Sequence, residues 1–130
     1  MIVVDASALA DVLLRVPGAS RVEERLLGPD ETLHAPHLID LEILQVLRRF
    51  AAQGGWQEDR AVEALSDFEA IRIARHAHEP LRDRIWALRN NVTAYDAAYI
   101  ALAEVLDCPL VTRDGKPSGV PGIEATVEVL

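Results

Sequence analysis

Four acidic residues of this chain occupy positions at which a carboxylate is costly. Asp5 ends a run of apolar residues near the start of the chain, and Asp114 follows a second apolar run. Glu42 interrupts the apolar face of a predicted helix, and Asp96 lies just inside the start of another. Carboxylates that meet in one small domain repel one another, by roughly 4 kcal/mol for a pair about 4 Å apart at an effective dielectric constant of about 20. A hard divalent cation is the simplest partner that holds them together, and it implies chemistry on a phosphate.

Each of these acids also has an ordinary structural interpretation. Asp5 is able to cap the helix that follows it, and Glu42 is able to form a buried ion pair with an arginine. Asp96 lies three residues after Thr93, which is the spacing of a capping box. Asp114 precedes a glycine in a pattern typical of a tight turn. The hypothesis of a metal site therefore depends on all four acids meeting at one place.

The pattern of apolar residues predicts short buried strands separated by helices. Strands are expected at 2–5, 32–35 and 110–112, with an edge strand at 124–129, and residues 71–74 fit either a strand or a helix end. Helices are expected at 7–15, 19–27, 37–53, 58–69 and 93–106, and another opens at Glu79-Pro80. Ser7 is the expected N-cap of the first helix. This alternation predicts an α/β fold with a mainly parallel sheet flanked by helices on both faces.

Topology and helical spacing explain why the four acids are expected to meet. Ligands of open parallel sheets bind beyond the carboxyl ends of the strands, where both Asp5 and Asp114 stand. Residues three and four apart share one face of a helix, so Glu42 lies on or beside the apolar face that is expected to pack against the core. By the same spacing, Asp96 shares a face with Tyr99.

Size and composition describe one domain, residues 1–130, that is long enough for a hydrophobic core. Hydrophobic residues make up 50% of the chain and charged residues 26%, as is usual in globular proteins. The net charge of −8 argues against a protein that coats nucleic acid, although an acidic nuclease site would itself contribute to that charge. The only cysteine, Cys108, cannot form an internal disulfide, and no secretory signal or membrane-length apolar run occurs. We therefore expect a cytoplasmic protein with no membrane association.

Motifs for other chemistries are absent or incomplete. The four histidines lack the cysteines or the spacing of a zinc site, and no phosphate-binding glycine loop or serine-hydrolase elbow occurs. A phosphatase of the Asp-x-Asp type would need an acid where Ser7 stands. A receiver-like phospho-acceptor would use Asp5, Thr112 and Lys116, but it needs a second acid at the position of Ala6. Both stay open as minor alternatives.

Several segments resemble the PIN-domain ribonucleases, in particular the VapC toxins of bacterial toxin–antitoxin modules. These segments are the opening IVVDASA, the helix that carries Glu42, the run YDAAYIALAE at 95–104 and the run LVTRD at 110–114. The resemblance covers essentially the whole chain and implies a three-layer α/β/α fold. It also implies endoribonuclease activity that depends on Mg²⁺ or Mn²⁺ and cleaves single-stranded or looped RNA.

On the matching positions, the resemblance implies an acidic site made of Asp5, Glu42, Asp96 and Asp114, with Ser7 and Thr112 as its polar support. It further implies a toxin that is inhibited by a VapB-type antitoxin, in a homodimer or in a toxin–antitoxin hetero-oligomer. Family members often continue past the last acid with an apolar helix, whereas residues 115–122 here read as a Gly- and Pro-rich loop that would position Asp114 less firmly. The arginines at 48–49 and 82–89 are candidates to steer RNA, although ordinary solvated helix faces explain them equally well. A PIN-like module that binds a partner without cutting RNA is the main alternative.

Overall fold

Five short strands form one parallel sheet in the computed structural model, which describes residues 1–130. They are β1 (Ile2–Val4), β2 (Leu33–Pro36), β3 (Ile73–His76), β4 (Leu110–Thr112) and β5 (Val127–Val129). Their order across the sheet is β3-β2-β1-β4-β5, and every neighbouring pair is parallel. The first strand of the chain therefore lies at the centre of the sheet. The predicted parallel sheet is confirmed, and β5 lies at an edge as expected.

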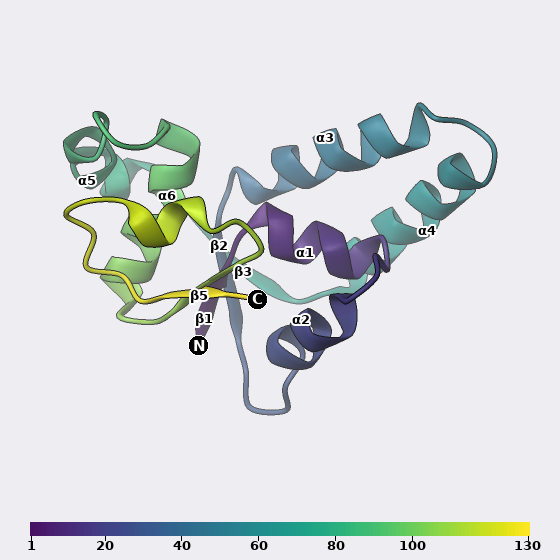
Figure 1. Ribbon diagram of the computed structural model, residues 1–130, viewed down its shortest axis with the longest axis horizontal. Helices are drawn as coiled ribbons and strands as arrows, with labels where there is room; N and C mark the ends of the chain where they lie inside the picture. Colours follow the sequence, from purple (N-terminus) through teal and green to yellow (C-terminus); the bar gives the residue numbers. More distant parts are fainter.

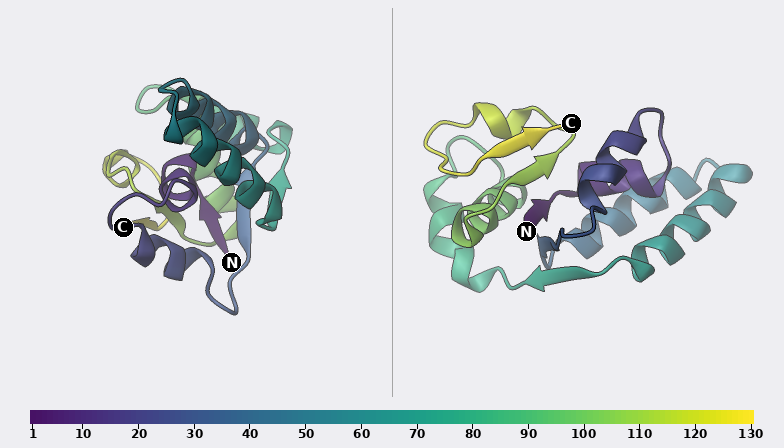
Figure 2. Two further views of the ribbon diagram at one scale, coloured as in Figure 1. Left: turned by 90° about the vertical axis from the view of Figure 1, so that its right-hand side faces the viewer. Right: turned by 90° about the horizontal axis from the view of Figure 1, so that it is seen from below.

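Helices cover both faces of this sheet. They are α1 (Ala6–Leu13), α2 (Ala19–Leu26), α3 (Ile39–Ala51), α4 (Trp56–Ala70), α5 (Arg82–Ala87) and α6 (Ala94–Leu106), with short 3₁₀ helices η1 (Glu79–Leu81) and η2 (Lys116–Gly119). The chain steps in one direction from β1 to β3 and then returns past β1 to β4, so right-handed crossovers place the helices of the two parts on opposite faces. Figures 1 and 2 show α1 to α4 on one side and α5 and α6 on the other. The three-layer α/β/α architecture is confirmed.

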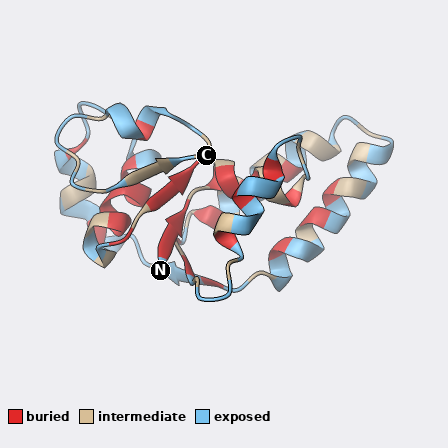
Figure 3. Cartoon of the chain, turned by 60° about the horizontal axis from the view of Figure 1, so that its bottom comes forward, coloured by how far each residue is buried: buried red, intermediate tan, exposed pale blue.

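The hydrophobic core runs through the centre of the sheet into the helices on each side. Every residue of β1 and β4 is buried, as expected of short β-branched strands with no alternation. In α6 the buried residues run without a break from Ala97 to Ala103, and α3 contributes Ile39, Ile43 and Leu47. Figure 3 shows this concentration of buried residues in the central strands and on the inner faces of the helices. No helix of the chain has both the length and the apolar character that a membrane crossing requires.

Two local predictions differ from the structure. Asp5, and not Ser7, is the N-cap of α1, because the Asp5 side chain accepts the free backbone N–H of the first helical turn. The last strand spans only Val127–Val129, and the backbone N–H of Glu124 donates to Glu104 of α6 (2.8 Å) instead of pairing along the sheet. Both differences depend on side-chain partners that the apolar pattern does not encode.

Candidate active site

The carboxyl ends of the two central strands form the edge at which the predicted acids gather. Asp5 directly follows β1, and its backbone N–H donates to the carbonyl of Val111 in β4 (3.2 Å). Glu42 lies in the first turn of α3, which leaves the same edge after β2. The chain runs along α6 back toward the start of β4, so Asp96 in the first turn of α6 returns to this edge as well. Asp114 follows β4, two residues after its end.

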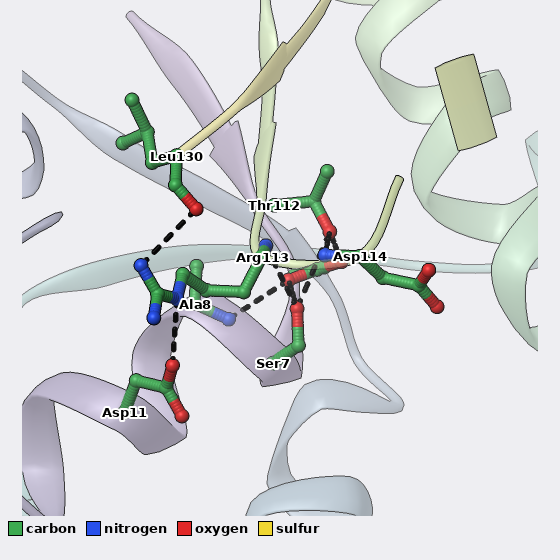
Figure 4. A network of polar contacts seen from close by, with 8 residues as sticks. Ser7, Ala8, Asp11, Thr112, Arg113, Asp114 and Leu130 are labelled. Atoms are coloured by element: carbon green, nitrogen blue, oxygen red, sulfur yellow. Dashed lines mark hydrogen bonds and ion pairs between the residues drawn. The ribbon is translucent and has the colours of Figure 1, made fainter. Parts of the chain in front are cut away.

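Asp5 is held by hydrogen bonds to both of its carboxylate oxygens. Oδ1 accepts from the Ser7 hydroxyl (2.6 Å) and from the backbone N–H of Ala8 (3.0 Å), and Oδ2 accepts from the Thr112 hydroxyl. The hydroxyls are fixed in turn, because Ser7 Oγ accepts from the backbone N–H of Arg113 (3.1 Å) and Thr112 Oγ1 accepts from that of Asp114 (2.9 Å). Figure 4 shows this network between the start of α1 and the end of β4. The predicted polar support thus contacts Asp5 directly.

Asp5 is partly buried, and no basic side chain lies within ion-pair distance of its carboxylate. Burial raises the pKa of the Asp5 carboxyl, and the hydrogen bonds from Ser7, Thr112 and Ala8 oppose that rise only in part. The negative charge of Asp96 adds to it. Arg113, which lies nearby, is already committed: its guanidinium donates to Asp11 (2.8 Å) and to the carbonyl of Leu130 (3.1 Å), as Figure 4 shows.

Glu42 is half-buried and has one hydrogen-bond partner, the hydroxyl of Tyr99, which donates to Oε1 (2.7 Å). Burial raises the pKa of Glu42 against the lowering effect of that bond, and the charges of Asp96 and Asp5 raise it further. Burial also raises the pKa of Tyr99 well above its usual value, and the acceptor Glu42 reinforces the shift. Tyr99 is therefore a site residue that the sequence hypothesis did not include. Its one signal was the three-residue spacing from Asp96 on the same helix.

Asp96 and Asp114 are both exposed but differ in their relation to the other acids. The backbone N–H of Asp96 donates to Thr93 Oγ1 (3.2 Å), so this N-cap interaction is present and leaves the Asp96 carboxylate free. The charge of Asp96 acts on both Asp5 and Glu42. Asp114 instead accepts the backbone N–H of its own turn at Lys116 (2.9 Å), and Figure 4 shows its carboxylate directed away from Ser7. The structure thus brings three acids into mutual electrostatic contact and leaves Asp114 apart.

None of the four acids forms an ion pair, so the interpretation of Glu42 as a buried salt bridge is wrong. Eight other acids lie within ion-pair distance of a cation: Asp11, Glu31, Asp40, Glu63, Asp67, Glu79, Glu104 and Glu128. No three acidic, histidine or cysteine side chains converge closely enough to surround an ion by themselves. Uncompensated carboxylates nevertheless suit a hard cation such as Mg²⁺, which binds through one or two carboxylates and keeps several waters. The donor set at this edge therefore fits a divalent cation that is only partly coordinated by protein.

Comparison with known proteins identifies the family to which the chain belongs. The family model described as PIN domain matches residues 2–122. The chain belongs to the PIN-domain family. It is 39% identical over 129 residues to Ribonuclease VapC1 of Mycobacterium tuberculosis, an alignment that covers 98% of this chain and 96% of the relative. The resemblance to the VapC branch of the PIN domains is thereby confirmed.

Solved structures of other proteins show the same fold. A crystal structure of a protein from Pyrobaculum aerophilum superposes with a TM-score of 0.72 at 22% identity and covers 99% of this chain and 83% of that one. A toxin–antitoxin complex from Klebsiella pneumoniae contains a chain that superposes with a TM-score of 0.66 at 20% identity, with 99% and 97% covered. At such low identity the likeness concerns the fold, which these chains share while most of their side chains differ.

Proposed function

We propose that this protein is a metal-dependent endoribonuclease and the toxin of a type II toxin–antitoxin module. The observation that carries the proposal is the pair Asp5 and Glu42, two carboxylates that are partly shielded from water, raised in pKa and given no cation by the fold. Among the acids that the fold leaves without a counter-charge, these two alone are not exposed, and they stand at the edge where parallel α/β sheets bind ligands. The ribonuclease name of a relative aligned over almost the whole chain supports RNA as the substrate.

In this proposal the residues divide into those that hold a cation and those that orient the holders. Asp5 and Asp96 would bind Mg²⁺ or Mn²⁺ first, and Glu42 and Asp114 would bind it directly or through its waters. The cation, when bound, supplies positive charge for the phosphate and lowers the pKa of water. Ser7 and Thr112 fix the Asp5 carboxylate in one orientation, and Tyr99 does the same for Glu42. Such outer hydrogen bonds set the direction of the remaining lone pairs.

The proposal includes partners and a location. A VapB-type antitoxin would inhibit the enzyme, and the similarity to a chain of a toxin–antitoxin complex supports this. Co-purification with such an antitoxin and the mass of the assembly in solution would distinguish a homodimer from a hetero-oligomer. A cytoplasmic site of action suits an RNA substrate, and the chain has a single, unpaired cysteine, Cys108.

An RNA cleavage assay tests the reaction. The protein is incubated with structured and single-stranded RNA in Mg²⁺ or Mn²⁺, beside an EDTA control, and products are resolved on a denaturing gel. We expect cleavage that leaves 5′-phosphates, requires the metal and falls at least about 100-fold in Asp96→Asn. The matched control is Asp59→Asn, since Asp59 is exposed on α4 and forms no ion pair. Cleavage in EDTA, or equal cleavage by Asp96→Asn, would contradict the mechanism, and metal binding without any cleavage would identify a silent binding module.

A further inference from the structure

A polar groove leads away from the carboxylates on the side of Asp96. Its volume is about 600 Å³, and its lining includes Asp96, Thr93, Asn91, Arg89 and Lys116. The Arg89 guanidinium is held in place there, because it stacks over the Trp86 ring (4.5 Å to the ring centroid) and donates from Nη1 to the Trp86 carbonyl (2.9 Å). A guanidinium carries five N–H donors, so this arrangement leaves several of them available to a ligand.

A second hollow borders the carboxylates on the side of Glu42. Its volume is about 410 Å³, and its lining includes Glu42, Ser7, Arg49 and Tyr95. Tyr95 is 68% exposed, and such an exposed ring offers a stacking face to an unpaired base. The two hollows therefore share the acidic site as their border, and each contains at least one basic side chain.

The basic side chains in these hollows belong to a small group that the fold leaves free. Seven of the 13 basic residues pair with acids: Arg15, Arg25, Arg60, Arg75, Arg82, Arg84 and Arg113. The remaining six are Arg21, Arg48, Arg49, Arg72, Arg89 and Lys116. Three of these six line the two hollows. On a chain of net charge −8, a polyanion is attracted where positive charge is not paired, and half of the unpaired cations flank the acids.

We propose that Arg49 on one side, and Arg89 and Lys116 on the other, bind the phosphates that flank the scissile phosphate of a single-stranded RNA. This inference rests on the proposed ribonuclease function and adds the path of the substrate. A single strand follows two concave hollows and stacks a base on Tyr95, whereas an A-form duplex presents a convex backbone with its bases already stacked. Arg49, Arg89 and Lys116 bind and align the substrate, and the reacting atoms lie at the carboxylates between them.

The dependence of RNA binding on salt tests this path. Binding of a fluorescein-labelled single-stranded RNA to the cleavage-deficient full-length Asp5→Asn protein is measured by fluorescence anisotropy over a series of NaCl concentrations. Each phosphate contact contributes about 0.7 to the slope of log K against log salt for a single strand. We expect Arg49→Gln, Arg89→Gln and Lys116→Gln each to reduce the slope by about that amount. Arg21→Gln and Arg72→Gln, which remove free arginines outside both hollows, are matched controls with an unchanged slope.

The outcomes separate this inference from the proposed function. If the wild-type enzyme cleaves RNA but the groove variants keep the full slope, or the controls lose as much, the path is wrong and the ribonuclease stands. Binding of a duplex of the same sequence as tightly as the single strand would also overturn the path. Variants that weaken binding of a VapB-type antitoxin without changing RNA binding would reassign these cations to the protein partner. A wild-type protein that neither binds nor cleaves RNA would overturn both proposals.

Discussion

Acidic residues at the two ends of the sheet experience opposite electrostatic environments. At the carboxyl end, burial and neighbouring negative charge raise the pKa of Asp5 and Glu42. Toward the other end, Glu31 precedes β2 and Glu104 lies in the last turn of α6. Burial opposes their ionisation too, but hydrogen bonds outweigh it and lower both pKa values: Glu31 accepts from the N-terminal ammonium and Arg25, and Glu104 from Arg84 and the backbone. The direction of each pKa shift is therefore decided by the hydrogen-bond and ion-pair partners of the carboxylate, and not by burial alone.

The two groups consequently contribute to stability in opposite pH ranges. A lowered pKa means that Glu31 and Glu104 stabilise the fold above their unfolded pKa, and that this stabilisation is lost as the pH falls through the folded pKa. A raised pKa means that Asp5 and Glu42 favour the fold below their unfolded pKa and lose that contribution as the pH rises through the folded pKa. Near neutral pH the metal-free site therefore destabilises the protein, a cost that is common where a site is built for function.

Removing the charge of one site acid should both stabilise the metal-free protein and weaken RNA cleavage. In Glu42→Gln the amide oxygen still accepts from Tyr99, so the shape is kept while the charge is removed. We expect RNA cleavage to fall about 100-fold. In EDTA the melting temperature should rise, by about 4 °C for each kcal/mol relieved. Differential scanning calorimetry beside the cleavage assay measures both changes, and a lower melting temperature with full activity would contradict the comparison.

Replacing Glu by Gln at Glu104, an acid that forms an ion pair toward the other end of the sheet, should instead lower stability. Glu104 is mostly buried, accepts from Arg84 (2.7 Å) and binds the backbone N–H of Glu124 (2.8 Å). Glu104→Gln should lower the free energy of unfolding by about 2 kcal/mol, since Arg84 is left without its partner but stays partly solvated. Urea denaturation at neutral pH measures this. Glu69→Gln, an exposed and unpaired position on α4, is the control and should change stability little.

Removing the hydroxyl that orients Glu42 should affect metal use more than folding. Tyr99→Phe keeps the buried ring but removes the only hydrogen bond to Glu42. We expect the Mn²⁺ concentration needed for half-maximal cleavage to rise about tenfold, with the fold intact by circular dichroism. Tyr95→Phe keeps the exposed ring that would stack on a base and removes a hydroxyl that forms no hydrogen bond, so it should leave that Mn²⁺ concentration unchanged. A loss of activity that no Mn²⁺ concentration restores would show that Tyr99 does more than orient Glu42.

The smallest expected effect concerns how the free energy of unfolding changes as the pH falls. Glu31→Gln removes a carboxylate whose pKa is lowered by the N-terminal ammonium and Arg25. The difference between wild type and variant should be under about 1 kcal/mol near pH 7 and should vanish as the pH falls below the folded pKa of Glu31. Urea titrations repeated at several pH values measure the difference. A gap that widens in acid would reverse the sign proposed for this end of the molecule.

Local sequence patterns predicted the elements and the edge on which the acids stand, because both follow from periodicity and strand order. The buried runs of β1 and β4 and the apolar α6 are such cases. The Tyr99–Glu42 hydrogen bond joins residues 57 positions apart and depends on how α3 and α6 lie across the sheet, which periodicity does not record. The turn that engages the Asp114 carboxylate is different, because the Asp-Gly pattern is itself typical of a tight turn at that position.

Direct measurement of Mn²⁺ binding tests the central claim that Asp5, Glu42 and Asp96 act on one cation, either directly or through its bound waters. Isothermal titration of the wild type is compared with Asp5→Asn, Glu42→Gln, Asp96→Asn and the control Asp59→Asn. We predict a single site whose affinity falls at least about tenfold in each of the three site variants and is unchanged in the control. Equal affinity in all five proteins, or loss confined to one acid, would contradict it.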